Sequence, residues 1–317
     1  MIMQEGRKRN CYNFFDLQVN GYGGVDFNGD ALTAEMLQNV CERMERDGVE
    51  GVLATLITDD LDKMANRLAN LVRLREQVPI ARRLIYGFHL EGPFLSPETG
   101  YRGAHPLHAI RHPNVSDMSR LLDAGAGLVR LVTLAPEYDT DQCVTKMLVE
   151  SRVIVSAGHC NPSLDDLGRA ADAGLSMFTH LGNATPMLLH RHDNIIQRVL
   201  SMSDRLWVCF IADGAHIAFP ALRNYLRVVG VDRAIVVTDA VAPAGLGPGR
   251  YRYFDWDVNI GEDLVAMAPD GSHLIGSVVT MPKAFENLVS ECGLTEAEAL
   301  RLTSHNPYLV CRGLIGP

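Results

Sequence analysis

The sequence predicts an α/β fold in which eight strands and eight helices close into a (β/α)8 barrel, or TIM barrel, with a β-rich insertion after the eighth strand. Three observations lead to this prediction: short apolar segments recur along the chain, amphipathic segments separate them, and the apolar segments are continuously hydrophobic. Strands that alternate with helices form right-handed βαβ units and a parallel sheet. Continuous hydrophobicity indicates a sheet that is buried on both faces.

Each expected strand is short, and most of the strands are followed by a segment of helical spacing. The strands are expected at 14–20, 51–57, 84–90, 128–134, 153–159, 175–180, 206–211 and 234–238. The helices are expected at 33–46, 60–75, 116–124, 141–150, 167–173, 195–202, 219–228 and 282–292. Ser163 and Asp166 form a capping-box pattern, which predicts the start of the fifth of these helices, at 167–173.

Residues 242–281 separate the eighth strand from its helix. They contain strand-like segments at 251–260 and 264–268 and a turn at 269–272. A loop of this length inside a compact domain usually has a function, so we expect a β-rich flap over the mouth of the barrel. We expect residues 14–307 to form a single barrel domain, with 1–13 and 308–317 as remnant termini.

Composition and charge narrow the class of protein. The chain has 317 residues and a net charge of −9, from 29 basic and 38 acidic residues without a run of one sign. This balance argues against a nucleic-acid surface. Neither a membrane span nor the apolar region of a signal peptide is found. The seven cysteines are scattered and form no CxxC pair, so we expect free thiols in a reducing cytoplasm.

Two histidines, His159 and His180, each end a short apolar run, and a helical segment lies between the two runs. Both are therefore expected at the carboxyl ends of neighbouring strands, where catalytic groups gather in a parallel barrel. Two imidazoles on neighbouring strand ends can share one metal ion, and imidazole suits zinc. Either histidine alone is typical of a buried core residue, but the two together favour a functional site.

The third and eighth strands add carboxylates at the same end of the barrel. Glu91 with His159 and His180 gives three protein ligands and leaves a fourth position open for water, as in catalytic zinc sites. Such a metal lowers the pKa of water to about 7 and polarises a carbonyl. Asp239 would take the proton from that water and pass it to a leaving nitrogen. A helix N-cap is the alternative role for Asp239.

Eight segments resemble, in order, those of the N-acetylglucosamine-6-phosphate deacetylases, a family of the amidohydrolase superfamily, and the resemblance covers about residues 16–307. No single segment decides the resemblance, but the eight in order make it strong. They are DLQVNGYGGVDF at 16–27, HLEGPF at 89–94, GAH at 103–105, SAGH at 156–159, THLGNA at 179–184, IADGAH at 211–216, VTDAVAPAG at 237–245 and GSVVTM at 276–281.

The resemblance implies hydrolysis of an N-acetyl amino-sugar 6-phosphate, such as N-acetylglucosamine 6-phosphate, to acetate and the free amine. It places one divalent metal ion on Glu91, His159 and His180, with Zn2+ preferred over Fe2+, Co2+ or Mn2+, and it makes Asp239 the general base and acid. It implies a homodimer with part of the phosphate site supplied across the interface. The implied substrate contacts are His105, Asn183, Ala184, His216 and Arg191, the last as a phosphate clamp.

Some segments depart from the family pattern. Gln18 and Asn20 stand where many amidohydrolases carry His-x-His for a second metal, and amides are poor zinc ligands, so we expect one metal. Few residues precede the first strand, so most of the family's β-sandwich domain is expected to be missing. The segments 96–102 and 185–194 also differ, which makes the reaction type better supported than the substrate.

Two alternative functions stay open at this point. A related amidohydrolase could cleave a different amide, and residues at the rim of the site would decide this. A non-catalytic sugar-phosphate sensor is the second alternative, and the intact set of Glu91, His159, His180 and Asp239 argues against it. His89 is expected to orient a ligand or the substrate.

Overall fold

A computed structural model describes residues 13–253, 256–267 and 274–313 of the chain. Eight strands form one parallel sheet in the order β1-β4-β5-β6-β7-β8-β9-β10. The sheet closes where the amides of Asn20 and Gly21 donate to the carbonyl of Ala240. The predicted (β/α)8 barrel is therefore confirmed. Its strands are β1 (Phe14–Val19), β4 (Val49–Ile57), β5 (Ile85–Glu91), β6 (Val129–Leu134), β7 (Ile154–Ala157), β8 (Met177–Phe178), β9 (Trp207–Phe210) and β10 (Ala234–Val236).

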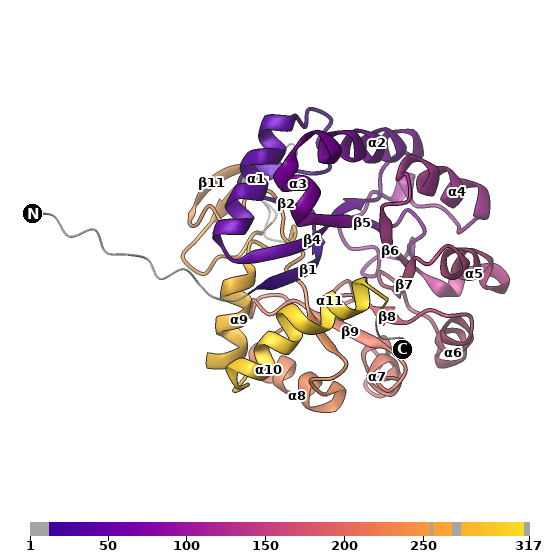
Figure 1. Cartoon of the computed structure of the whole chain (residues 1–317). Helices are drawn as coiled ribbons and strands as arrows, with labels where there is room; N and C mark the ends of the chain where they lie inside the picture. The colour runs from indigo at the N-terminus through magenta and orange to yellow at the C-terminus, as the bar shows by residue number, and fades with distance from the viewer. Residues whose placement is uncertain (1–12, 254–255, 268–273, 314–317) are drawn as a thin grey trace, which may run out of the picture.

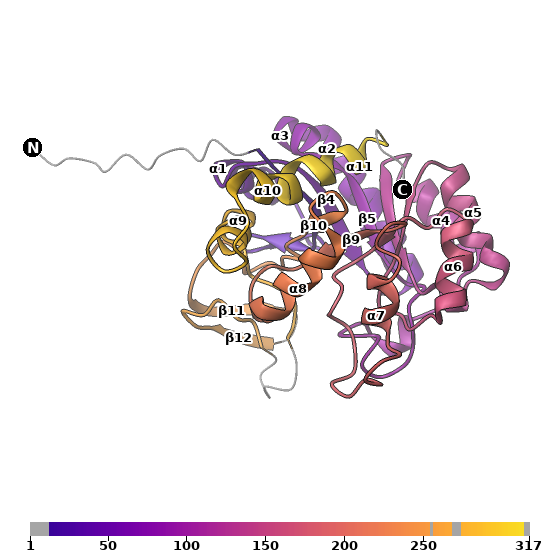
Figure 2. The same cartoon turned by 90° about the horizontal axis from the view of Figure 1, so that it is seen from below.

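Helices surround the barrel in a ring (Figure 1). A short extra helix that was not predicted, α3 (Pro79–Leu84), directly precedes β5. Its last residue is the one at which the strand was expected to begin. Helices α10 (Glu296–Leu300) and α11 (Asn306–Cys311) lie across one end of the barrel (Figures 1 and 2). The ring contains α1 (Ala34–Arg46), α2 (Leu61–Gln77), α4 (Val115–Ala124), α5 (Cys143–Glu150), α6 (Leu164–Asp172), α7 (Ile195–Leu200), α8 (Phe219–Val229) and α9 (Met281–Ser290).

Side-chain caps explain where several helices begin, because the first amides of a helix have no partner within it. The predicted capping box is present at α6, where Ser163 Oγ accepts from the Asp166 amide and Asp166 Oδ2 accepts from the Ser163 amide, both at 3.1 Å. Thr295 and Glu298 form the same box at the start of α10. These local signals set the helix starts independently of the barrel core.

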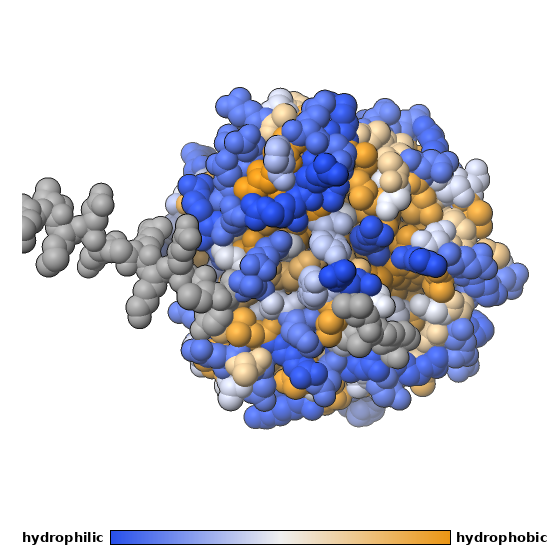
Figure 3. All heavy atoms as spheres, in the orientation of Figure 1, coloured by the Kyte–Doolittle hydropathy of each residue, from blue (hydrophilic) through white to orange (hydrophobic). Residues whose placement is uncertain are grey.

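The core of the barrel is continuous with the layer between strands and helices. All six residues of β1 are buried, because one face of the strand points into the barrel and the other packs beneath the helices. On the face shown in Figure 3, hydrophilic residues predominate around the rim and hydrophobic patches show between them, as expected for amphipathic helices. In the part of the chain that the structure describes, no helix has the length and apolar character needed to cross a membrane.

The insertion after β10 is β-rich, as predicted. The segment expected as one strand at 251–260 contains parts of two strands, β11 (Gly249–Tyr253) and β12 (Trp256–Ile260), which pair antiparallel. Isolated bridges join Ile260 to Ala266 and Met267 to Leu274. The turn expected at 269–272 lies outside the described residues. In Figure 2, β11, β12 and the long loop before α7 project from the end of the barrel opposite α10 and α11.

His89 lies in β5 with its side chain inside the barrel and no exposed surface. Its Nε2 is 2.8 Å from Thr133 Oγ1, and its Nδ1 is 3.3 Å from Thr55 Oγ1. Burial lowers the pKa of His89 from 6.5 to about 4, although the charge of Glu91 opposes the shift. The imidazole is therefore neutral at pH 7. Its hydrogen bonds go to two threonines of the core and not to a predicted metal ligand, which the sequence led us to expect.

This lowered pKa predicts a loss of stability in mild acid. Between pH 6.5 and about 4 the unfolded chain protonates His89 and the native chain does not, so the free energy of unfolding falls as the pH falls through this window. From pH 7 to pH 5 the contribution is about 2 kcal/mol. Urea unfolding at both pH values should show a smaller loss of stability for His89→Gln than for the parent protein. An equal loss in the two proteins would contradict the prediction.

Candidate metal centre and active site

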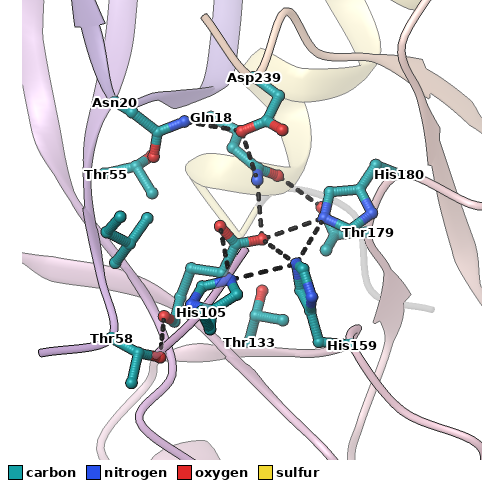
Figure 4. A network of polar contacts seen from close by, with 12 residues as sticks. Gln18, Asn20, Thr55, Thr58, His105, Thr133, His159, Thr179, His180 and Asp239 are labelled. Atoms are coloured by element: carbon teal, nitrogen blue, oxygen red, sulfur yellow. Dashed lines mark hydrogen bonds and ion pairs between the residues drawn. The ribbon is translucent and has the colours of Figure 1, made fainter. Parts of the chain in front are cut away.

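The predicted site residues converge at the carboxyl ends of the barrel strands (Figure 4). Glu91 is the last residue of β5, and His159, His180 and Asp239 follow β7, β8 and β10. The last three have positive φ values of 50°, 34° and 50°. A left-handed backbone is costly for a residue other than glycine, and such residues cluster at functional sites. Strands β7, β8 and β10 each end two residues before the end expected from sequence, because the backbone turns at these residues.

Glu91, His159 and His180 bring three donor atoms together. Glu91 Oε1 lies 3.1 Å from His180 Nε2 and 3.4 Å from His159 Nε2. The two Nε2 atoms are 3.1 Å apart. All three side chains are nearly inaccessible to solvent, with exposed fractions of 9% or less. The structure thus brings together the three side chains that the sequence predicts as metal ligands.

This arrangement fits one divalent metal ion. In a tetrahedral zinc site with bonds of about 2.1 Å, neighbouring donor atoms lie about 3.4 Å apart, close to the separations seen here. His159 Nδ1 lies 3.1 Å from the carbonyl oxygen of Tyr101, to which it can donate, leaving Nε2 with a free lone pair. A Cβ on Gly103, whose φ is +57°, would lie 3.0 Å from the His159 ring, so this loop packs closely over the imidazole.

The two histidines keep Glu91 ionised. Burial opposes ionisation of Glu91, but hydrogen bonds and charges from His159 and His180 outweigh it and hold the pKa of Glu91 well below its usual range. Burial likewise opposes protonation of His180, and the hydrogen bond and charge of Glu91 raise its pKa instead. Glu91 therefore supplies an anionic oxygen between two imidazole nitrogens.

His105 lies against this centre. Its Nε2 is 3.3 Å from His159 Nε2 and 3.9 Å from Glu91 Oε2. Glu91, His105 and His159 also form a set of potential metal ligands whose donor atoms lie within 4.8 Å of one another. Burial, together with the neighbouring His159, lowers the pKa of His105 to about 3. A neutral imidazole here can contact either the metal or a substrate group bound beside it.

Two amide side chains hold Asp239, and one of them, Gln18, also donates to Glu91. Asn20 Nδ2 donates to Asp239 Oδ1 at 2.7 Å, and Gln18 Nε2 donates to the same oxygen at 3.0 Å. Burial and then the charge of Glu91 raise the pKa of Asp239 above its ordinary value. A carboxyl group with a raised pKa is suited to exchange a proton with a reacting group.

Asp16 accepts hydrogen bonds from Thr238, the residue before Asp239, and was not among the predicted site residues. Its Oδ2 accepts from Thr238 Oγ1 at 2.5 Å, and its Oδ1 accepts from the Thr238 amide at 3.2 Å. Burial raises the pKa of Asp16 to about 7. The signal in the sequence is an acidic residue inside the apolar run of the first strand, which normally requires a specific partner.

The predicted substrate contacts lie on the loops around the centre. Asn183 Nδ2 donates to the His180 carbonyl at 3.0 Å, and Ala184 has a φ of 49°. His216 Nδ1 lies 2.6 Å from Asp213 Oδ2, which orients its ring. Arg191 is exposed on the loop between β8 and α7. Arg191 is not part of the buried cluster, whereas His216 lies near enough to Asp239 for its charge to affect the Asp239 pKa.

Similarity to curated relatives shows the family to which the chain belongs. The chain is 33% identical over 297 residues to an N-acetylgalactosamine-6-phosphate deacetylase of Shewanella sp. (strain ANA-3), with 93% of this chain and 72% of the relative covered. The chain belongs to the N-acetylglucosamine/N-acetylgalactosamine-6-phosphate deacetylase family. An N-acetylglucosamine-6-phosphate deacetylase of Bos taurus is 33% identical over 306 residues, with 93% and 72% covered. No family model matches the chain.

Solved structures of this deacetylase family share the fold. N-acetyl-D-glucosamine-6-phosphate deacetylase from Mycobacterium smegmatis superposes with a TM-score of 0.84 at 31% identity, covering 95% of this chain and 78% of that one. A mutant of the same enzyme, in complex with N-acetyl-D-glucosamine-6-phosphate, also gives a TM-score of 0.84, at 30% identity, with 95% and 77% covered. Members of the family are hydrolytic enzymes of the amidohydrolase superfamily, so the chain is assigned to that class.

Proposed function

We propose that this protein hydrolyses the N-acetyl group of an amino-sugar 6-phosphate, converting N-acetylglucosamine 6-phosphate and water to glucosamine 6-phosphate and acetate. The observation that carries the proposal is the convergence of Glu91, His159 and His180, with donor atoms 3.1–3.4 Å apart, beside Asp239. The deacetylases that this chain resembles act on such sugar phosphates.

Glu91, His159 and His180 would hold the metal ion, and their nitrogen and oxygen donors favour Zn2+, with Fe2+, Co2+ or Mn2+ as alternatives. When bound, the ion supplies Lewis acidity, which lowers the pKa of water and polarises a carbonyl. A single ion per chain is proposed because Gln18 and Asn20 present amides that already donate to Asp239.

Asp239 moves the proton in this mechanism. Its carboxylate accepts a proton from the attacking water as the water oxygen bonds to the acetyl carbon, and it then gives that proton to the sugar nitrogen as the C–N bond breaks. Acetate and the free amine are the products, and the 6-phosphate is unchanged. His105, Asn183, Ala184 and His216 are proposed to orient the sugar, with Arg191 binding the phosphate.

The proposal extends to the domain organisation, the oligomeric state and the cellular location of the protein. Residues 14–307 would form one catalytic domain, with 242–281 as its flap. Arg191 lies on the same loop as Met187 and Leu188, whose exposed fractions are 98% and 93%, which supports a homodimer contact at this loop. The free cysteines among the described residues support a cytoplasmic location.

The substrate can be tested by measuring acetate and free amine together. N-acetylglucosamine 6-phosphate and N-acetylgalactosamine 6-phosphate are compared with unphosphorylated N-acetylglucosamine as the control. The proposal predicts equal amounts of acetate and amine from at least one phosphorylated sugar, with kcat/KM lower by about 100-fold for the control, which lacks the remote binding energy of the phosphate. Hydrolysis of only a different amide would assign the site to another substrate, and no hydrolysis at all would favour a sensor.

A further inference from the structure

Gln18 makes hydrogen bonds to three residues from different strand ends of the barrel (Figure 4). Its Nε2 donates to Glu91 Oε1 at 2.9 Å and to Asp239 Oδ1 at 3.0 Å. Its Oε1 accepts from Thr179 Oγ1 at 2.7 Å. The side chain has no exposed surface, so water does not compete for these contacts.

The chemistry of these partners fixes the orientation of the amide. An ionised carboxylate can only accept, so both N–H groups of Gln18 must face Glu91 and Asp239. The Thr179 hydroxyl donates to the opposite end of the amide. A rotation by 180° about the terminal bond would turn the amide oxygen toward two carboxylate oxygens and the NH2 group toward a hydroxyl, which the charges oppose. Thr179 directly precedes His180, so the same contact also reaches the strand end that carries a predicted ligand.

Asn20 provides a contrast within the same strand end. Its Nδ2 also donates to Asp239 Oδ1, at 2.7 Å, but no hydrogen bond joins it to Glu91 among the described contacts. Its Oδ1 is buried and has no hydrogen-bond partner in the described part of the chain. Asn20 therefore holds Asp239 alone, whereas Gln18 holds Asp239 and Glu91 through one nitrogen atom.

We propose that Gln18 is a positioning residue that sets Glu91 and Asp239 relative to each other, with Thr179 fixing the orientation of its amide. This inference rests on the proposed function for the roles of Glu91 and Asp239. One N–H group directs the ligand oxygen, and the other directs the base. The metal ligand and the proton-transfer group, which come from distant parts of the sequence, are thereby held in one frame.

The test measures two properties separately in the full-length protein. Zn2+ affinity is measured without substrate, by competition with a chelating dye, and kcat and KM are measured on N-acetylglucosamine 6-phosphate. Gln18→Met keeps the length of the side chain and removes its hydrogen bonds. We expect it to weaken Zn2+ binding about 10-fold and to lower kcat about 100-fold, with KM changed less than about threefold.

Two further variants separate positioning from general damage to the fold. Asn20→Leu should lower kcat and leave the Zn2+ affinity unchanged, because Asn20 does not contact Glu91. Thr179→Val should change both properties in the direction of Gln18→Met, and Thr179→Ser should restore them. The double variant Gln18→Met/Thr179→Val should be no worse than Gln18→Met alone, because both changes remove the same interaction.

Several outcomes would overturn the inference. Parent-like Zn2+ affinity and kcat in Gln18→Met would do so, as would a change confined to KM, which would indicate a substrate contact. Additive effects in the double variant would show that Thr179 acts independently. If Gln18→Met does not fold, the inference is tested by comparing Thr179→Val with Thr179→Ser. Equal Zn2+ affinity and kcat in these two variants would then overturn it. If no sugar phosphate is hydrolysed by the parent protein, the proposed function fails, and the Zn2+ affinities still test the link between Gln18 and Glu91.

Discussion

Asp239→Asn is expected to lower kcat for deacetylation by about 1,000-fold while the chain still binds its metal ion. The amide is nearly the same size as the carboxylate, so the local packing is kept. The amide cannot take a proton from water. The variant therefore lacks the proton transfer to which the raised pKa of Asp239 is suited. The measurement is kcat on N-acetylglucosamine 6-phosphate together with the zinc content of the same preparation.

The control for this variant is Asp165→Asn, an equal change of charge at an exposed position of α6. It should leave both kcat and zinc content unchanged. Activity in Asp239→Asn within about tenfold of the parent protein, with zinc still bound, would exclude Asp239 as the main proton-transfer group and would leave it a structural role.

His180→Gln is expected to weaken Zn2+ binding by at least about 100-fold and to reduce deacetylation in parallel. His180 Nε2 is 3.1 Å from both Glu91 Oε1 and His159 Nε2, so its removal leaves a ligand set of two residues. Zn2+ affinity by dye competition and kcat at saturating Zn2+ are the measurements.

His89→Gln is the matched control for this ligand variant. His89 is also a buried histidine near the centre, but its hydrogen bonds go to Thr55 and Thr133. The same substitution at His89 should therefore keep Zn2+ affinity within about threefold of the parent protein, less than loss of a ligand-supporting contact would cost. A loss of affinity at His89 as large as at His180 would contradict the assignment of the ligands.

The barrel could be predicted from sequence because strands buried on both faces leave continuous apolar runs. The strand ends could not, because apolar residues continue into positions where the backbone has already turned. β8 has only two residues, Met177–Phe178, although the apolar run suggested 175–180. Helix α3 was missed because its six residues adjoin the apolar run of the next strand.

The site was predictable to the extent that each residue type carries its own chemistry. Glu91, His159, His180 and Asp239 are recognisable because carboxylates and imidazoles at strand ends indicate metal binding and proton transfer. From the sequence, Gln18 could be identified only as an amide, a poor metal ligand, and its positioning role could not be predicted. Its contacts with Glu91 and Asp239 span 73 and 221 residues of sequence and depend on closure of the barrel. Asp16 escaped notice for the same reason, since its partner Thr238 lies 222 residues away.

The most direct test of the account is a titration of the metal-free protein with Zn2+ while acetate release from N-acetylglucosamine 6-phosphate is followed. The account predicts no turnover without metal, a linear rise in activity as Zn2+ is added, and a break at one ion per chain. Full activity in the metal-free protein would contradict the metal-dependent mechanism, and a break at two ions per chain would contradict the single-metal site.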